Sequence, residues 1–172
     1  TKATIHCTLC CLRVFLKYLA SEHILLVDWS YLVPKDNYKK EAKLPTTYTK
    51  EEIQRMLLAV DRGNPKGKRD YAILLLACRL GLRASDICQL RFDNLIWQEN
   101  IIALIQEKTE RRIELPLLAG VGNAIIDYLK YGRPVSQLSY VFLHANNGDR
   151  RLHEPTLHSI VSFYLRRAGI QN

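Results

Sequence analysis

Arg83 and Lys108 are basic side chains of the types that can act on an anionic substrate. Arg83 closes a Gly-Leu-Arg sequence that follows a long apolar run, and the acid Asp86 comes just after it. Lys108 lies in the charged segment Glu-Lys-Thr-Glu-Arg, residues 107–111. A guanidinium stabilises negative charge on oxygen atoms, and an ammonium can donate a proton as a general acid. Taken singly, each residue also fits a structural interpretation, because Gly-Leu-Arg can end a helix and a hairpin lysine is usually only solvated.

Cysteine and histidine residues are the other reactive groups. The five cysteines are odd in number and lie in apolar, helix-like surroundings, which predicts free thiols. Cys7 and Cys10 have Cys-x-x-Cys spacing near His6, but no second pair completes a tetrahedral zinc site. Small core residues on a helix are the better interpretation, and we predict no metal site.

The net charge of +8 favours a polyanionic partner, because lysine and arginine residues that neutralise phosphates release condensed counterions. DNA, RNA and acidic membrane surfaces all fit this charge, and so does a merely solvated face. No apolar run approaches the ~20 residues that span a bilayer. The chain also lacks the pattern of a secretory or transit peptide, so we expect a cytoplasmic protein without a membrane partner.

Hydrophobic periodicity predicts a mainly helical chain. One amphipathic helix begins near Ile5, and another is expected to begin at a capping box formed by Thr49 and Glu52. Breaks at Gly63, Pro65 and Gly67 are expected to precede a central apolar helix, and Gly81 to lead into a short one. The further helices are expected over residues 69–80, 84–90, 116–131 and 154–168.

A small sheet is expected in the middle of the chain. Residues 95–97, 101–105 and 112–115 are β-prone runs, which predict three antiparallel strands with residues 107–111 as a charged turn. Residues 144–151, with the sequence HANNGDRR, have the composition of a polar loop. The predicted fold class is therefore α+β, mainly α, with a small three-stranded antiparallel sheet.

The domain organisation follows from composition. Residues 33–46 are polar, basic and punctuated by Pro34 and Pro45, which is typical of a linker. Residues 1–32 then form the end of an upstream helical domain, and residues 47–172 form the main domain.

Two segments resemble motifs of the tyrosine recombinase, or phage integrase, family. RDYAILLLACRLGLRASDICQLRFDNLIW, residues 69–97, resembles its first arginine motif: an apolar helix, Gly-Leu-Arg, a small residue, an acid, and a Leu-Arg pair before a strand. IQEKTERRIELPL, residues 105–117, resembles the family's lysine hairpin. The resemblance runs from about residue 44 to residue 172, and the opening helix resembles the end of the family's core-binding (SAM-like) domain.

The resemblance implies a helical catalytic core of the DNA breaking-rejoining type and site-specific recombination or integration of DNA, as in mobile elements. It places a catalytic arginine on Arg83, a general acid on Lys108 and a supporting acid on Asp86, where the family more often has glutamate. Its transesterification passes through a 3′-phosphotyrosyl bond that retains the energy of the phosphodiester, which implies no cofactor and no metal. The implied partners are double-stranded DNA and, for the full-length protein, a homotetramer on DNA, with no small-molecule ligand.

Other basic residues are candidates for phosphate contacts. We favour Arg111 and Arg150 as DNA-backbone contacts, while Lys66, Lys68 and Arg69 form another basic group before the central helix.

The family's remaining motifs are not found in these 172 residues. None of the five histidines is followed three positions later by arginine, as His-x-x-Arg requires. Tyr140 and Tyr164 precede the place where that motif falls, so no nucleophile is assigned and this chain alone is predicted to be inactive. The alternatives are a non-catalytic DNA-binding module or truncated regulator, and a helical protein-interaction domain, which predicts no salt-dependent DNA affinity.

Overall fold

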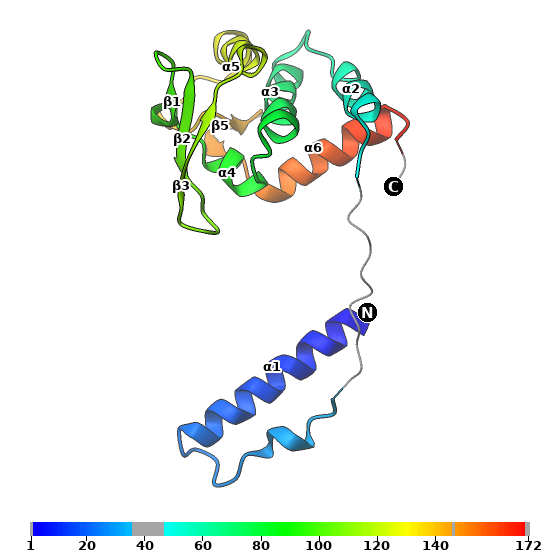
Figure 1. Cartoon of the computed structure of the whole chain (residues 1–172), viewed down its shortest axis with the longest axis vertical. Coiled ribbons are helices and arrows are strands. Elements are labelled where there is room, and N and C mark those ends of the chain that lie inside the picture. The colour runs from blue at the N-terminus through cyan, green and yellow to red at the C-terminus, as the bar shows by residue number, and fades with distance from the viewer. Residues whose placement is uncertain (1, 36–46, 146, 171–172) are drawn as a thin grey trace. The chain divides into compact units, whose positions relative to one another are not determined.

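The computed structural model of the chain describes residues 2–35, 47–145 and 147–170. They belong to two compact units, Thr1–Thr46 and Thr47–Asn172 (Figure 1). None of the helices in the described residues has the length and apolar character needed to cross a membrane. Of the predicted linker, only residues 33–35 are described, and residues 36–46 lie outside the described part.

The first unit is a helix with a short return segment packed on it. α1 (Lys2–Ser21) contacts the 3-10 helix η1 (Trp29–Leu32), which Asp28 caps by accepting a 2.8 Å hydrogen bond from the backbone N–H of Ser30. In the described part of this unit, Val33 is the one buried apolar side chain. An isolated pair of this kind has little apolar surface to bury, so most of the apolar face of α1 remains open to solvent.

The second unit begins with two capped helices. α2 (Lys50–Leu58) has the predicted capping box: Thr49 accepts from the N–H of Glu52, and the Glu52 carboxylate accepts from that of Thr49. α3 (Pro65–Leu80) begins at Pro65, so the prediction of a break there and a helix from residue 69 is wrong. Asn64 caps the helix, and proline suits its first turn, where the missing N–H would have had no helical partner.

α3 is the centre of the second unit, as its apolar circumference predicts. Ile73, Leu74 and Leu76 are completely buried, and the helix contacts α2, α5 (Ala119–Tyr131) and α6 (Glu154–Arg167) (Figure 1). Each side chain of this size stabilises the fold by roughly 1.5–3 kcal/mol when fully buried. Gly81 ends α3 in the left-handed conformation, with φ of 64°, and the chain enters the next, short helix from it through Leu82 and Arg83.

The predicted three-stranded antiparallel sheet is confirmed. β1 (Leu95–Ile96), β2 (Ile101–Ile105) and β3 (Arg112–Pro116) pair in the order β1-β2-β3. The 3-10 helix η2 (Phe92–Asn94) leads into it from α4 (Ala84–Gln89). On β2, the buried Ile102 and Leu104 alternate with more exposed neighbours, which fixes the face of the sheet that packs on the core.

The last third of the chain departs twice from the predictions. α5 begins at Ala119, not at residue 116, because Pro116 pairs with Ile101 as the end of β3. The predicted polar loop contains a second sheet, in which β4 (Leu143–His144) pairs with β5 (Asn147–Arg151). Leu143 and Leu152 are completely buried at the base of this hairpin and hold its ends in the core. α6 spans almost the predicted range.

Candidate active site

Arg83 stands at the junction of α3 and α4. It is the N-cap residue of α4, with an extended backbone. The preceding Leu82 is buried at 6% exposure and anchors the turn in the core, which leaves the guanidinium of Arg83 on the surface. Among the described residues no side chain or backbone group forms a hydrogen bond or ion pair with this guanidinium, so it is free to bind an anion.

Lys108 lies in the turn between β2 and β3. The turn is closed by hydrogen bonds from the N–H of Gln106 to the oxygen of Arg111 (2.9 Å) and from the N–H of Glu110 to the oxygen of Gln106 (2.8 Å). Glu110 takes the left-handed conformation, with φ of 53°, and Thr109 donates to the Gln106 side chain at 2.9 Å. This ordered turn presents an exposed ammonium with no carboxylate of the described residues within ion-pair distance.

Asp86 connects these two elements. It lies on α4, is 2% exposed, and its Oδ1 accepts a 3.2 Å hydrogen bond from the N–H of Glu107, the residue before Lys108. Its Oδ2 is buried and has no hydrogen-bond partner among the described residues, although buried polar atoms are nearly always paired. A buried carboxylate thus ties the lysine hairpin to the helix that begins after Arg83.

The two arginines predicted to contact the DNA backbone are exposed in different parts of the second unit. Arg111 is at the end of the lysine hairpin, and Arg150 is on β5. Arg150 borders a shallow hollow of about 420 Å³, together with Tyr140, Arg151 and others.

Arg91 and Tyr140 are two residues of this region that the sequence reasoning did not select. Arg91 donates a 3.2 Å hydrogen bond to the Tyr140 hydroxyl and lies 4.8 Å from the centre of its ring. Arg151 lies 5.6 Å from the same ring. The Leu-Arg pair at the end of α4 was a signal for Arg91, but nothing in the sequence pairs it with Tyr140. The ring holds two guanidiniums close to Arg150, which concentrates positive charge on this surface.

Two of the basic residues before the central helix are engaged inside the protein. Lys68 pairs with Asp127 at 2.8 Å, and Arg69, at 4% exposure, pairs with Asp70 at 2.8 Å. Lys68 therefore already has a carboxylate partner, and most of the Arg69 side chain is buried against Asp70, so neither is a free cation on the open surface. Lys66 remains exposed.

Arg69 and Asp70 belong to a buried polar network that includes Tyr164. Arg69 also donates to the oxygen of Leu143 at 3.1 Å, and the Tyr164 hydroxyl donates to Asp70 Oδ2 at 3.2 Å. Burial, followed by the charge of Asp70, raises the pKa of Tyr164 to about 12. A buried, protonated, hydrogen-bonded phenol is a structural group, which agrees with its exclusion as a nucleophile.

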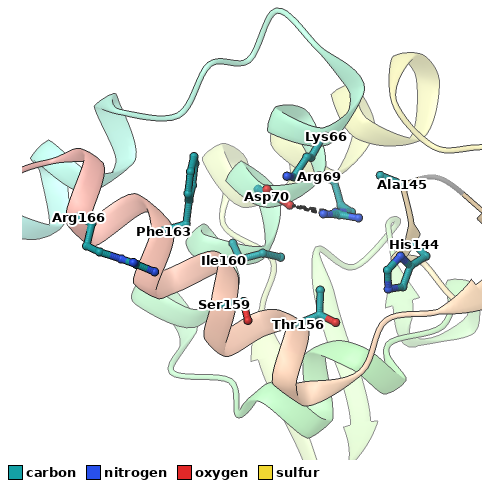
Figure 2. Close-up of a pocket in the computed structure, with 10 residues that line it drawn as sticks. All are labelled: Lys66, Arg69, Asp70, His144, Ala145, Thr156, Ser159, Ile160, Phe163 and Arg166. Carbon is teal, nitrogen blue, oxygen red and sulfur yellow. Dashed lines mark hydrogen bonds and ion pairs between the residues drawn. The ribbon is translucent and has the colours of Figure 1, made fainter.

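The network forms one wall of a hollow of about 430 Å³ between α3 and α6, which we call the α3–α6 pocket (Figure 2). Its lining includes Lys66, Arg69, Ser159, Ile160, Phe163 and Arg166. Arg83 follows the other end of α3, a helix roughly 24 Å long at 1.5 Å per residue. The pocket is therefore separate from the surface that carries Arg83 and Lys108.

The cysteines are free thiols, as predicted. In the described parts of the chain, no three histidine, cysteine, aspartate or glutamate side chains gather in a way that could hold a metal ion. Burial raises the pKa of the Cys88 thiol to about 11, which makes it a poor nucleophile.

The family to which this chain belongs follows from its match to a known protein family. A family model described as the phage integrase family matches residues 46–172. The chain belongs to the phage integrase family. This confirms the resemblance found in the sequence and covers the whole unit that carries Arg83, Asp86 and Lys108.

Relatives of this phage integrase family member include tyrosine recombinases. It is 36% identical over 162 residues to y4rA of Sinorhizobium fredii, provisionally named an integrase/recombinase, covering 94% of this chain and 39% of y4rA. It is 29% identical over 133 residues to tyrosine recombinase XerC of Bacillus pumilus, covering 77% of this chain and 43% of XerC. The chain thus spans about two fifths of the length of these relatives.

Solved structures show the same fold at low sequence identity. A lambda integrase tetramer bound to a Holliday junction matches with a TM-score of 0.69 at 12% identity, over 99% of this chain and 47% of that one. The XerA recombinase matches with a TM-score of 0.61 at 23% identity, over 74% of this chain and 45% of that one. The mainly helical integrase fold with its small sheet is therefore confirmed for the family member.

Proposed function

We propose that this chain is the arginine- and lysine-bearing part of a tyrosine recombinase that performs site-specific recombination or integration of DNA. The observation that carries the proposal is the hydrogen bond between Asp86 and the backbone of Glu107, because it joins the Arg83 and Lys108 elements within a phage integrase fold. Neither cation has a charged partner among the described residues, so both are free to meet a scissile phosphate.

The proposed reaction is a phosphodiester transesterification. A tyrosine oxygen attacks phosphorus, a 3′-phosphotyrosyl bond forms, and the bond to the 5′ oxygen breaks. Arg83 binds a non-bridging oxygen and stabilises the extra negative charge of the five-coordinate phosphorus. Lys108 donates its proton to the departing 5′ oxygen as general acid. Neither step by these two residues draws on a metal or an organic cofactor.

Asp86 acts as a positioning residue in this scheme. Its buried carboxylate fixes the hairpin residue next to Lys108, and a correctly oriented general acid contributes typically 10²–10⁴-fold to a rate. Its unpaired Oδ2 leaves an acceptor for one further donor at the same place. Arg111 and Arg150 are proposed as phosphate contacts that orient the duplex, together with the Arg91–Tyr140–Arg151 cluster.

Double-stranded DNA and a homotetramer on DNA are the proposed partners of the complete enzyme, and the cytoplasm is its proposed location. These 172 residues contain no His-x-x-Arg motif, and their Tyr164 is engaged by Asp70. We therefore propose that this chain alone binds DNA without cutting it.

Binding is tested by fluorescence anisotropy of a labelled duplex across a salt series. Affinity should fall steeply with salt, and Arg111→Gln or Arg150→Gln should each reduce the salt slope by about one. Arg55→Gln, an exposed arginine on α2, is the matched control and should change nothing. Salt-independent or unmeasurable binding would favour the interaction-domain alternative.

Catalysis is tested in a chain extended to the span of its relatives, using a nicked suicide substrate and a gel assay for covalent protein–DNA adducts. Arg83→Ala should abolish the adduct and leave most of the DNA affinity intact, while Arg55→Ala should retain both. Adduct formation at the normal rate by the Arg83 variant refutes the assignment of that residue.

A further inference from the structure

The α3–α6 pocket has a chemistry that the proposed reaction does not use. Its lining comes from α3, from α6 and from His144 and Ala145, as Figure 2 shows. Its position at the start of α3 separates it from Arg83, which follows the end of that helix. A function for this pocket is therefore independent of the recombinase proposal.

The pocket carries uncompensated positive charge. Asp70, its one acid, accepts two hydrogen bonds from Arg69 on Oδ1 and one from Tyr164 on Oδ2. Lys66 and Arg166 complete the basic lining, and no carboxylate of the described residues lies within ion-pair distance of either. The Arg69–Asp70 pair cancels internally, so the two exposed cations determine the sign of the potential.

Arg69 adds hydrogen-bond donors that are already held in place. Its guanidinium carries five N–H groups, of which two bond to Asp70 and one to the oxygen of Leu143. The side chain is 4% exposed and contributes to the pocket wall, so little conformational entropy is lost when an anion accepts from the remaining N–H groups.

The α6 side of the pocket is partly apolar. Ile160 and Phe163 are one helical turn apart, and Phe163 keeps 48% of its surface exposed although it is a large aromatic residue. Lys66 lies 6.0 Å from the centre of the Phe163 ring, so cationic and apolar surfaces adjoin. A ligand that fills the pocket therefore needs an anionic group beside an apolar one.

We propose that the α3–α6 pocket is a docking site for an acidic peptide segment that carries an aliphatic or aromatic side chain. Carboxylates of the segment meet Lys66, Arg166 and the free N–H groups of Arg69, and its apolar side chain covers Phe163. A peptide side chain can enter a hollow of about 430 Å³ and supplies the apolar group that Phe163 faces, whereas the phosphates of a DNA duplex supply charge alone.

The test uses the 172-residue chain and a fluorescein-labelled heptapeptide containing four glutamates and a central leucine, followed by anisotropy. The peptide should bind saturably, and a glutamine version should bind about tenfold more weakly or not at all. Lys66→Glu combined with Arg166→Glu should weaken binding about tenfold or more, and Phe163→Ser should also weaken it. All three side chains are exposed, so the thermal unfolding midpoint should stay unchanged and serves as the folding control.

Arg79→Glu is the matched control, because it reverses an exposed arginine in the last turn of α3, at the other end of the helix from the pocket, and should leave peptide affinity unchanged. Amide chemical-shift changes on adding the peptide should cluster at Ser159, Phe163 and their neighbours. The proposal is overturned by absent binding, by shift changes centred elsewhere, by affinity that survives the double reversal, or by a DNA duplex that displaces the peptide through the pocket residues.

Discussion

Removing the carboxylate of Asp70 should destabilise the second unit more than any other single truncation in the polar network. Asp70→Ala deletes the two bonds from Arg69, at 2.9 and 2.8 Å, and the 3.2 Å bond from Tyr164. Arg69 then stays 4% exposed with one remaining bond, to the oxygen of Leu143. Breaking a buried pair in this way costs about 3–5 kcal/mol, out of a typical total stability of about 5–15 kcal/mol.

Two further variants separate the effect of losing the ion pair from the effect of losing the Tyr164 hydrogen bond. Tyr164→Phe keeps the ion pair and removes one long bond to a charged acceptor, so it should cost only about 1.5 kcal/mol. The triple variant Arg69→Met, Asp70→Leu, Tyr164→Phe leaves no orphaned group, and apolar replacement of a buried pair is often neutral. It should therefore be more stable than Asp70→Ala alone.

Urea unfolding followed by far-ultraviolet circular dichroism measures these differences, with equal m-values as the check that the variants share one native state. If Asp70→Ala costs less than about 1 kcal/mol, or if the triple variant is the least stable of the set, the reasoning from buried charge is refuted.

The remaining predictions concern pH, backbone space and the hydrogen bonds of one guanidinium. Because burial and Asp70 raise the pKa of Tyr164 to about 12, above the usual value of about 10, the folded state keeps a proton that the unfolded state loses. The contribution of Tyr164 to the unfolding free energy should therefore be constant below about pH 10 and fall from there to about pH 12, and Tyr164→Phe, followed by urea unfolding, should flatten that alkaline fall. A Cβ at Gly67 would overlap the carbonyl oxygen of Asp61, so Gly67→Ala should cost about 1–3 kcal/mol, whereas Gly120→Ala in open space on α5 should stabilise by about 0.5–1 kcal/mol. Arg133→Lys should lower the thermal midpoint, because the Arg133 guanidinium donates to four backbone oxygens between residues 134 and 141.

For each of these predictions, a specific result would contradict the reasoning. An unchanged alkaline transition in Tyr164→Phe would assign the loss of stability to other tyrosines. Equal effects of alanine at Gly67 and Gly120 would mean that the start of α3 can shift away from Asp61. If Arg133→Lys leaves the thermal midpoint unchanged, the positive charge at this position, and not the guanidinium hydrogen bonds, stabilises the loop.

Local signals made much of the fold predictable. The capping box of Thr49 and Glu52 is complete within four residues, so the start of α2 needed no tertiary information. The lysine hairpin likewise followed from two β-prone runs around a charged turn. Pro65 was misjudged because proline both breaks helices and begins them, and the Asn64 cap that decides between the two is a weaker signal.

Contacts between distant segments could not be predicted. The β4–β5 hairpin has a polar, loop-like sequence and is held by the buried Leu143 and Leu152 at its base, which only the folded core provides. Arg91 and Tyr140 are 49 residues apart in the chain, and no periodicity links them. For the candidate site, the resemblance selected Asp86, but its burial and its bond to Glu107 come from the packing of α4 against the hairpin.

The way the protein uses its positive charge explains why Arg83 and Lys108 stand out from other basic residues. Arg69 and Lys68 have carboxylate partners at 2.8 Å, and Arg69 is buried as well, so their charge supports the fold. Arg83 and Lys108 are exposed and lack such a partner among the described residues, yet a buried carboxylate, Asp86, organises the backbone between them. A cation needed only for solubility would not require an ordered backbone beneath it. Burying Asp86 with one oxygen unpaired costs free energy, and under the proposed function its bond to the backbone of Glu107 compensates by positioning the hairpin that carries Lys108 against the helix that follows Arg83.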